Sequence, residues 1–217
     1  MKIVTMLSQK GGTGKTTLAL HLAAAAELAG YTALVIDLDK QGSATDWKEE
    51  RTAERPIVVP GIAKRLKKAL ASAAEQGIEI ALIDTAAQTS DDAMLAIDEA
   101  DVVLIPTRPL IFDLRAITTN VRMVRLADKP AYVVFNQVRV GAVRLIEEVV
   151  GSVEETGVKV CPVAIEHRAA IAHALTADLV VQEYDPESPA AQQMADLFGW
   201  LVTALDGIRA PATAGAA

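Results

Sequence analysis

The stretch SQKGGTGKTTL, residues 8–18, is the most informative segment of this sequence. It follows the apolar run IVTML at 3–7 and precedes a helical pattern at 16–29, so a strand, a glycine loop and a helix are expected in that order. This is the context in which a G-x-x-x-x-G-K-[ST] motif binds the phosphates of a nucleotide. Gln9 replaces the first glycine of the motif, and Lys10 adds a second lysine. A phosphate-binding loop is therefore predicted, with one lysine more than it needs.

Each residue type of the loop has a physical role. Glycine lets backbone N–H groups turn inward around phosphate oxygens, where a Cβ would obstruct the loop, and the N-terminus of the following helix adds partial positive charge. Lys15 is predicted to reach the β- and γ-phosphates, and the Thr16 hydroxyl to ligate Mg²⁺. The predicted nucleotide-binding residues of the loop are Gly11, Gly12, Thr13, Gly14, Lys15, Thr16 and Thr17.

Three carboxylates follow two further apolar runs. The run at 80–84 ends in Asp84, the position of a carboxylate that holds Mg²⁺ in such sites. The run at 33–37 ends in Asp37, and Asp39 follows two residues later, so both side chains project to the same side of an extended chain and can face the γ-phosphate. An aspartate at a strand end also commonly caps the next turn. For Asp37 alone, that structural role is an equally good explanation.

Apolar runs alternate with helical patterns along the rest of the chain. Further strands are predicted at 102–106 and 131–136, and a weaker one at 159–165. Near-continuous apolar strands alternating with helices predict an α/β fold of the P-loop NTPase type: a doubly wound, mostly parallel sheet with helices on both faces. Ligands gather at the carboxyl ends of the strands in such sheets. The predicted helices span 16–29, 62–75, 91–97, 114–126, 142–155, 167–174 and 190–205.

The amino-acid composition and net charge limit the kinds of protein that this chain can be. The 217 residues, 51% hydrophobic and 23% charged, are typical of one globular domain, predicted over 1–208, with a disordered tail over 209–217. The single cysteine, Cys161, excludes a disulfide framework and a cysteine-ligated metal cluster within the chain. No uncharged apolar stretch reaches the length of a membrane span, so a cytoplasmic protein is expected. With a net charge of −7, nucleic acid could be bound only by a local basic patch.

Taken together, these motifs resemble the deviant Walker A ATPases of the ParA/MinD family. The resemblance is strongest to the short ParA proteins of plasmid partition, which lack an N-terminal DNA-binding extension, and it extends over residues 1–205. The motifs that carry it are KGGTGKT at 10–16, DLDKQ at 37–41, LIDT at 82–85, IPTRP at 105–109 with Asp113 after it, and the strand end Phe135-Asn136.

The resemblance implies a use for the second lysine. In that family two subunits sandwich two ATP molecules, and Lys10 would reach across to the partner's phosphates. A cation supplied in trans neutralises phosphate charge only once the dimer has formed, in the manner of an arginine finger. ATP binding would then favour the homodimer, and hydrolysis would release it. The family comparison also implies that Asp39 positions the attacking water and that Asp37 and Asp84 belong to the Mg²⁺ shell.

Two further expectations concern the base and the switch loops. The resemblance implies that Asn136, together with the backbone around Pro162, contacts adenine. The chain departs from the family where proline usually follows the second aspartate, because Lys40 stands there. It departs again after Asp84-Thr85, where Ala86 and Ala87 replace two prolines. Both departures lie in loops where the nucleotide state is expected to be read out.

The sequence also contains a basic segment. Residues 115–144 hold six basic residues against the single acid Asp128, the footprint of weak contact with a phosphate backbone. ParA-like proteins bind nonspecific DNA as ATP dimers, so Arg139, Arg144 and Arg168 are predicted to contact DNA. An ordinary solvated face is an equal alternative for each residue. The resemblance further implies association with the nucleoid in the ATP-bound state and a small centromere-binding or cargo adaptor protein as partner.

The leading interpretation is a ParA-type ATPase that partitions or positions a plasmid, a chromosome or another cargo. One alternative is a MinD-like regulator that cycles on the membrane. It would need a C-terminal amphipathic helix, and the ending LDGIRAPATAGAA has neither a basic nor a bulky apolar face, so no membrane partner is expected. The other alternative is a small-molecule carboxylate-activating enzyme on the same scaffold. It would need a substrate pocket of its own, which the sequence does not show.

Overall fold

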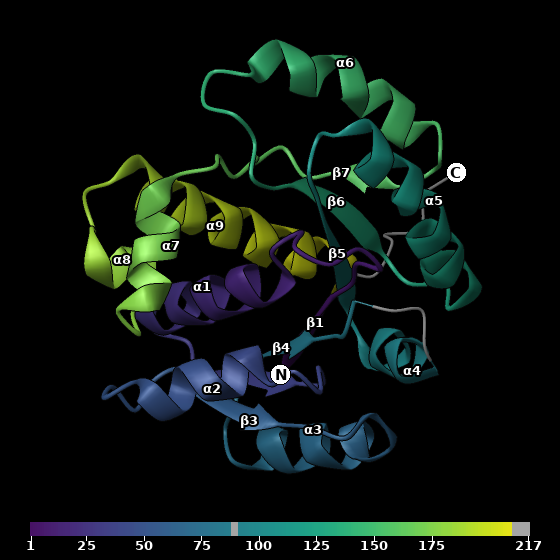
Figure 1. The fold of residues 1–217 in the computed structure, drawn as a ribbon. Helices are drawn as coiled ribbons and strands as arrows, with labels where there is room; N and C mark the ends of the chain where they lie inside the picture. Colours follow the sequence, from purple (N-terminus) through teal and green to yellow (C-terminus); the bar gives the residue numbers. More distant parts are fainter. Residues whose placement is uncertain (88–90, 210–217) are drawn as a thin grey trace, which may run out of the picture.

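The computed structural model of the protein describes residues 1–87 and 91–209. In these ranges the strands form one seven-stranded sheet in the order β3-β2-β4-β1-β5-β6-β7, with every neighbouring pair parallel (Figure 1). The sheet grows from β1 and β4 in both directions, so the predicted doubly wound α/β class is confirmed. The strands are β1 (Lys2–Met6), β2 (Ala33–Asp37), β3 (Ile57–Pro60), β4 (Ile80–Asp84), β5 (Val102–Thr107), β6 (Ala131–Phe135) and β7 (Lys159–Val160).

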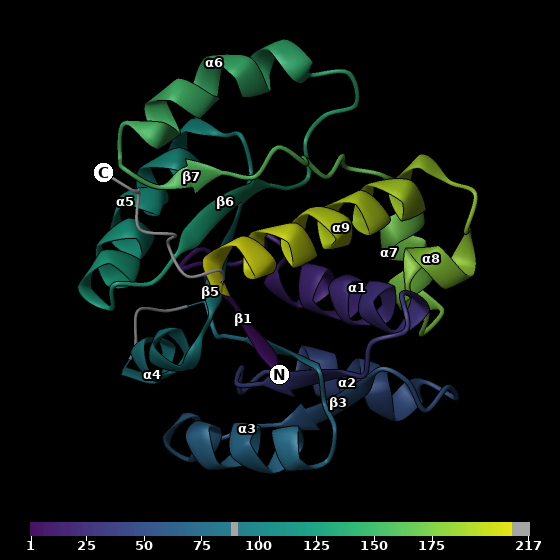
Figure 2. The same ribbon diagram turned by 180° about the vertical axis from the view of Figure 1, so that it is seen from behind.

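Helices cover both faces of this sheet. Helices α1 and α9, with α7 and α8, pack on one face, and α3 to α6 pack on the other (Figures 1 and 2). The helices are α1 (Lys15–Leu28), α2 (Ser43–Glu50), α3 (Leu66–Glu75), α4 (Asp91–Glu99), α5 (Ile111–Leu126), α6 (Val143–Glu154), α7 (Ala169–Thr176), α8 (Val181–Tyr184) and α9 (Pro189–Arg209), with a 3-10 turn η1 (Ala63–Arg65) before α3.

Alternation of side chains along the strands builds a core on each face. In β2, Ala33 and Val35 join the core under α1 and α9, whereas Leu34 and Ile36 join the core under α3. A strand covered on both faces needs an apolar residue at nearly every position. This requirement explains the near-continuous apolar runs of the sequence.

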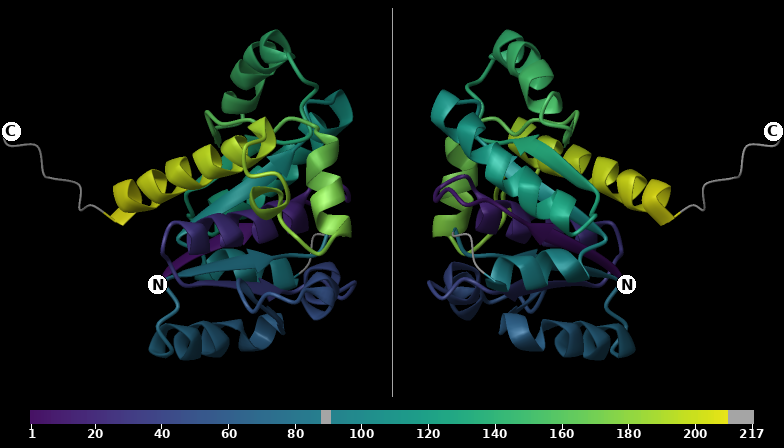
Figure 3. Two further views of the ribbon diagram at one scale, coloured as in Figure 1. Left: turned by 90° about the vertical axis from the view of Figure 1, so that its left-hand side faces the viewer. Right: turned by 90° about the vertical axis from the view of Figure 1, so that its right-hand side faces the viewer.

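Helix α1 packs against both β4 and α9, and α9 lies beside α1 on the same face of the sheet, where Trp200 packs on Tyr132 of β6 (Figures 2 and 3). The alanine run 23–26 is buried, because small side chains let α1 approach both neighbours closely. His21 is buried in the same helix, where its Nδ1 lies 2.7 Å from the carbonyl oxygen of Thr17 and its Nε2 accepts the N–H of Val181 at 3.1 Å. Burial lowers the pKa of His21 to about 4, so the ring is neutral and Nδ1 carries the proton.

The structure corrects several predicted elements. Strand β3 and helices α2 and α8 were not predicted: β3 is only four residues long, and α2 (SATDWKEE) buries only Ala44 and Trp47, so it has little apolar periodicity. The weak strand predicted at 159–165 is limited to Lys159–Val160. Arg209, predicted to begin a disordered tail, is the last residue of α9, and the rest of that tail, 210–217, lies outside the described residues.

Candidate nucleotide-binding site

The glycine loop between β1 and α1 is held in place by the end of β6. The Asn136 side-chain amide donates to the carbonyl oxygen of Thr13 at 2.8 Å, and the Gln137 amide donates to that of Gly12 at 3.0 Å. Gly12 and Gly14 have φ of 75° and 92°, the left-handed region that glycine adopts without strain. A Cβ on Gly14 would also collide with the Asn136 amide. Glycine is therefore required at Gly14 on two independent grounds.

Lys15 is the first residue of α1 and lies among the predicted carboxylates. Only 7% of it is exposed. Burial lowers the pKa of the Lys15 ammonium, and the charges of Asp84 and Asp39 oppose that shift. A desolvated lysine at a helix N-terminus, next to inward-turning backbone N–H groups, forms a strong site for an anion such as a phosphate.

Thr16 and Asp84 meet at the ends of α1 and β4. The Thr16 hydroxyl donates to Asp84 Oδ2 at 2.6 Å. The other oxygen, Asp84 Oδ1, is buried and has no hydrogen-bond partner in residues 1–87 and 91–209. Burial raises the pKa of Asp84 to about 7, and the hydrogen bond from Thr16 offsets part of that shift. An unpaired carboxylate oxygen beside a hydroxyl is the donor set that Mg²⁺ prefers, so these two residues fit the predicted ion.

Asp37 ends β2 directly beside Asp84, with which it is paired in register. Its Oδ1 accepts the N–H of Asp39 at 3.0 Å, and its Oδ2 accepts the N–H groups of Ala44 and Thr45, both at 3.1 Å, and the hydroxyl of Thr45 at 3.2 Å. Asp37 thus ties the loop after β2 to the first turn of α2. The capping role that the sequence left open is present, and the place of Asp37 in a Mg²⁺ shell stays a prediction.

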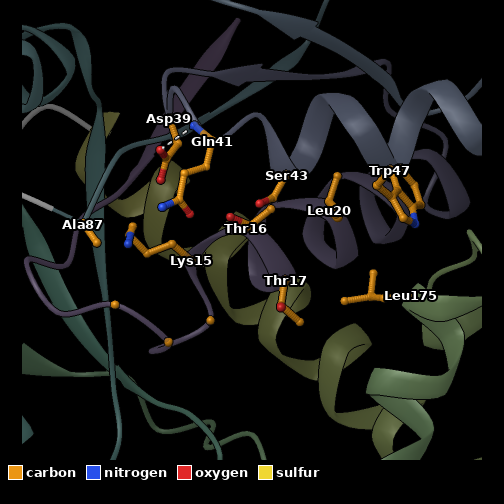
Figure 4. A pocket seen from close by; sticks show the side chains of 13 residues that line it. Lys15, Thr16, Thr17, Leu20, Asp39, Gln41, Ser43, Trp47, Ala87 and Leu175 are labelled. Atoms are coloured by element: carbon orange, nitrogen blue, oxygen red, sulfur yellow. Dashed lines mark hydrogen bonds between the residues drawn. The ribbon is translucent and has the colours of Figure 1, made fainter.

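Asp39 lines a cavity of about 450 Å³ next to the glycine loop (Figure 4). Its carboxylate accepts the N–H of Gln41 at 3.0 Å, and it is half-buried. Lys15, Thr16 and Ser43 lie in the same part of the cavity, so a carboxylate, an ammonium and two hydroxyls surround one space. The lining residues are Gly11, Gly12, Gly14, Lys15, Thr16, Thr17, Leu20, Asp39, Gln41, Ser43, Trp47, Ala87 and Leu175.

The other end of this cavity is apolar and was not predicted. Leu20, Trp47 and Leu175 come from α1, α2 and α7 and line it together (Figure 4). Trp47 is also stacked by the buried guanidinium of Arg51, 4.8 Å from the ring centre. Sequence reasoning missed this end because α2 was not recognised and because Leu175 is distant in the sequence. Trp47, on the charged segment SATDWKEE, was the one signal that could have pointed to it.

Neither Asn136 nor Pro162 lines this cavity in the described structure. Asn136 is buried against the glycine loop, with its amide on Thr13 and its Oδ1 accepting the N–H of Gln137 at 2.9 Å. Pro162 is exposed. The predicted contact of these residues with adenine stays a prediction, whereas the bracing of the loop by Asn136 is a role that the sequence did not indicate.

The two loops in which the sequence departs from the family pattern, after β2 and after β4, line the same cavity. Lys40 and Ala86 border one cavity of about 260 Å³, which Asp39, Thr85 and Asp92 also line. This cavity shares Asp39 and Gln41 with the larger one. The loops after β2 and β4 thus face each other next to the predicted γ-phosphate position.

Lys10 pairs with a carboxylate of its own chain. Its Nζ contacts Asp113 Oδ1, and Arg108 contacts the other oxygen of the same carboxylate through Nε. Asp113 is 2% exposed, whereas Gly11 and Gly12 next to Lys10 are exposed. In the single chain, therefore, the second lysine lies beside α5 rather than over the cavity.

The three arginines predicted to bind DNA differ in their surroundings. Arg139 and Arg144 are exposed, and neither takes part in an ion pair of the described residues. Arg168 is half-buried and donates to Glu166 Oε2 from Nε at 2.9 Å and from Nη2 at 2.5 Å. Glu166 therefore already neutralises Arg168, while Arg139 and Arg144 are available to an external anion.

A comparison with known families identifies the family of this domain. The model of the CobQ/CobB/MinD/ParA nucleotide-binding domain matches residues 4–181, which include the glycine loop and the three carboxylates. The chain belongs to this family. The predicted ParA/MinD resemblance is thereby confirmed. No helix in residues 1–87 and 91–209 has the length and apolar character needed to cross a membrane.

Two curated proteins and one solved structure illustrate what this chain is similar to. The maintenance of carboxysome distribution protein A of Gloeobacter kilaueensis is 34% identical over 122 residues, 55% of each chain. Protein ParA of Rhizobium radiobacter is 31% identical over 119 residues, 52% of this chain and 51% of its own. The chain thus spans about half the length of the curated relatives it matches. The septum site-determining protein MinD of Pyrococcus horikoshii, complexed with Mg-ADP, has the same fold, with a TM-score of 0.74 at 20% identity over 96% of this chain and 98% of its own.

Proposed function

We propose that this chain is a Mg²⁺-dependent ATPase of the ParA type that distributes a cargo. The observation that carries the proposal is the buried constellation of Lys15, Thr16 and Asp84, whose one carboxylate oxygen lacks a partner in the described structure. A Mg²⁺–nucleotide complex supplies both charges that this site lacks: an anion for Lys15 and a cation for Asp84. Family membership and the Mg-ADP complex of the MinD relative support the same ligand.

The remaining residues of the cavity suit hydrolysis. Asp39 is half-buried at the γ-phosphate end, held by its hydrogen bond to Gln41, and is proposed to orient the attacking water. Thr17 and the N–H groups from Gly11 to Gly14 are proposed to hold the phosphates. Asp37 is proposed to belong to the Mg²⁺ shell together with Asp84, which lies beside it. Its hydrogen bonds also keep the loop that contains Asp39 attached to α2.

The active state is proposed to be a homodimer with two ATP molecules between the subunits. Gly11 and Gly12 are exposed at the mouth of the cavity, so a second subunit can approach the phosphates there. In this dimer Lys10 leaves its own subunit and reaches the phosphates of the partner. Bound ATP then holds the two subunits together, and hydrolysis separates them.

Nonspecific DNA and a cargo adaptor are the proposed partners. Arg139 and Arg144 supply exposed cations that form no ion pair within the described part of the chain, while Arg168 is the weakest of the three candidates because Glu166 neutralises it. Association with the nucleoid in the ATP-bound state follows from this contact. The names of the relatives, a carboxysome distribution protein and a ParA, support cargo distribution as the biological role.

Nucleotide binding and turnover test the proposal together. Trp47 lines the cavity, and the other tryptophan of the chain, Trp200, packs edge to face on Tyr132 at 4.9 Å. In a Trp200→Phe variant, Mg-ATP should therefore change the emission of Trp47, and phosphate should be released. Adding Lys15→Ala should abolish both signals while the protein stays folded. A folded wild-type protein that neither responds to Mg-ATP nor releases phosphate would contradict the ATPase assignment.

A further inference from the structure

A second large cavity lies between α1 and α9. Its volume is about 550 Å³, within the range of small-molecule sites. The two helices pack side by side on one face of the sheet (Figure 2). Small residues open the space between them, Ala25 and Ala29 at the end of α1 and Ala195 and Gly199 on α9, each pair one turn apart. Among the described residues, this α1–α9 cavity shares no lining residue with the cavity next to the glycine loop.

The walls of the α1–α9 cavity are apolar. Tyr31 and Phe198 both line it and meet edge to face, with their ring centres 5.9 Å apart. Leu28 lines it as well and is 68% exposed. None of the described lining residues carries a charge. A charged ligand would lose its hydration there without gaining an ionic partner, so the cavity suits an uncharged, mainly apolar molecule.

One polar atom beside these walls has an unused hydrogen-bonding capacity. Gln182 of α8 lines the cavity and is 9% exposed. Its Nε2 donates to the carbonyl oxygen of His21 at 3.0 Å. Because that carbonyl can only accept, the amide cannot be turned over, and Oε1 lies on the other side of the group. Oε1 is buried and has no hydrogen-bond partner in residues 1–87 and 91–209. A donor supplied by a ligand would remove the cost of this unsatisfied acceptor.

We propose that the α1–α9 cavity binds a small, uncharged, mainly apolar molecule that donates one N–H or O–H group to Oε1 of Gln182. The rings of Tyr31 and Phe198 contact the apolar body of this ligand, and the ligand covers part of the exposed Leu28, which removes apolar surface from water. The site lies at the opposite end of α1 from Lys15, so it is separate from the proposed nucleotide site.

Two probes of similar shape, 2-naphthol and 2-methoxynaphthalene, test this proposal by titration calorimetry at neutral pH. Both are uncharged and mainly apolar, but only the hydroxyl of 2-naphthol can donate a hydrogen bond. We expect the wild type to bind 2-naphthol about fivefold more tightly than 2-methoxynaphthalene. Gln182→Met keeps the length of the side chain and removes the acceptor, so the two probes should bind this variant equally. Saturating Mg-ADP should displace neither probe from the wild type.

A pair of glycine substitutions in α9 locates the bound probe. A Cβ at Gly199 would meet no atom within 4 Å, so Gly199→Leu can fill the cavity without a clash at its Cβ, and leucine favours the helix over glycine. This variant should lose the binding of both probes. Gly207→Leu is the matched control, because its Cβ position is equally open and it lies outside the cavity lining. It should bind both probes as the wild type does.

Each part of the proposal can fail separately. A wild type that does not bind 2-naphthol, or unchanged binding in Gly199→Leu, would overturn the site. Equal affinity of the wild type for both probes would overturn the donor assignment, and the cavity would then fit an apolar side chain of a protein partner instead. Displacement by Mg-ADP would place the probe in the nucleotide cavity and would also overturn the proposal. The comparison of the two probes on the wild type stands even if Gln182→Met does not fold, and none of these results depends on ATP hydrolysis.

Discussion

Asp84→Asn should make the ligand-free protein more stable and the nucleotide complex weaker. Asp84 is buried, with one oxygen on Thr16 and the other without a partner in the described structure. Burial raises its pKa from 3.8 to about 7. Because the folded pKa lies above the unfolded one, ionising this carboxylate destabilises the folded state. The cost is absent below about pH 4, grows as the pH rises to about 7, and is constant above that.

The size of the effect follows from the shift. A rise of about three pKa units corresponds to a cost of about 4 kcal/mol at pH 8. Asparagine removes that cost but places an amide N–H₂ where Asp84 Oδ1 had no partner, which costs about 1–3 kcal/mol. The Thr16 hydrogen bond is kept by the amide oxygen. The net prediction is a gain of about 2 kcal/mol in the free energy of unfolding of the ligand-free variant at pH 8.

Urea unfolding at pH 8 and pH 4, with and without Mg-ADP, tests this prediction. At pH 8 without nucleotide the variant should be more stable than the wild type, and the advantage should disappear at pH 4. Mg-ADP at a hundred times its dissociation constant should stabilise the wild type by about 2.7 kcal/mol and the variant by much less. Asp98→Asn, at an exposed position of α4, is the control and should change little. A variant that is less stable than the wild type at pH 8, or that gains as much stability from Mg-ADP, would contradict the role assigned to Asp84.

Three other predictions follow from the site and its surroundings. Asp39→Ala should keep ATP binding and dimerisation but lose turnover, because a water-orienting carboxylate acts in the transition state; steady-state phosphate release at the wild-type rate would refute this role. Arg139→Ala combined with Arg144→Ala should weaken binding to every duplex about equally and flatten the log–log salt slope by about two, as measured by DNA titration at several salt concentrations. Sequence-selective loss would count against phosphate contact. Because the pKa of His21 is depressed to about 4, its contribution to stability should fall by roughly 3 kcal/mol as the pH falls from about 6.5 to about 4, so His21→Gln should gain about that much relative to the wild type in urea titrations over that range.

The elements of the fold that could be predicted are those whose sequence pattern lies within one run of consecutive residues. Strand β1, the glycine loop and α1 have an apolar run, a motif and a helical pattern in direct succession, so these elements followed from the sequence. The central strands β2, β4 and β5 were predicted within a residue or so, because they are buried on both faces. Short elements with few buried residues, such as β3 and α2, lack such a pattern.

The parts that could not be predicted depend on contacts between distant segments. The apolar end of the cavity joins Trp47 with Leu175, which the sequence separates by α3 to α6. The bond from Asn136 to the glycine loop and the pairing of Lys10 with Asp113 likewise arise only when the end of β6 and the start of α5 meet the glycine loop in the folded chain. Neutralisation of Arg168 by Glu166 is local, two residues away, and could have been noticed from the sequence.

The proposed ATP-dependent dimer requires that Lys10 acts across a subunit interface. This role can be measured by sedimentation of wild type and Lys10→Ala with Mg²⁺ and a slowly hydrolysed ATP analogue, alongside a separate titration of nucleotide affinity. Lys10→Ala should bind the analogue nearly as well as the wild type but stay monomeric, because Lys15 supplies the charge within the subunit. A Lys10→Ala protein that forms ATP-dependent dimers at wild-type concentrations would contradict it.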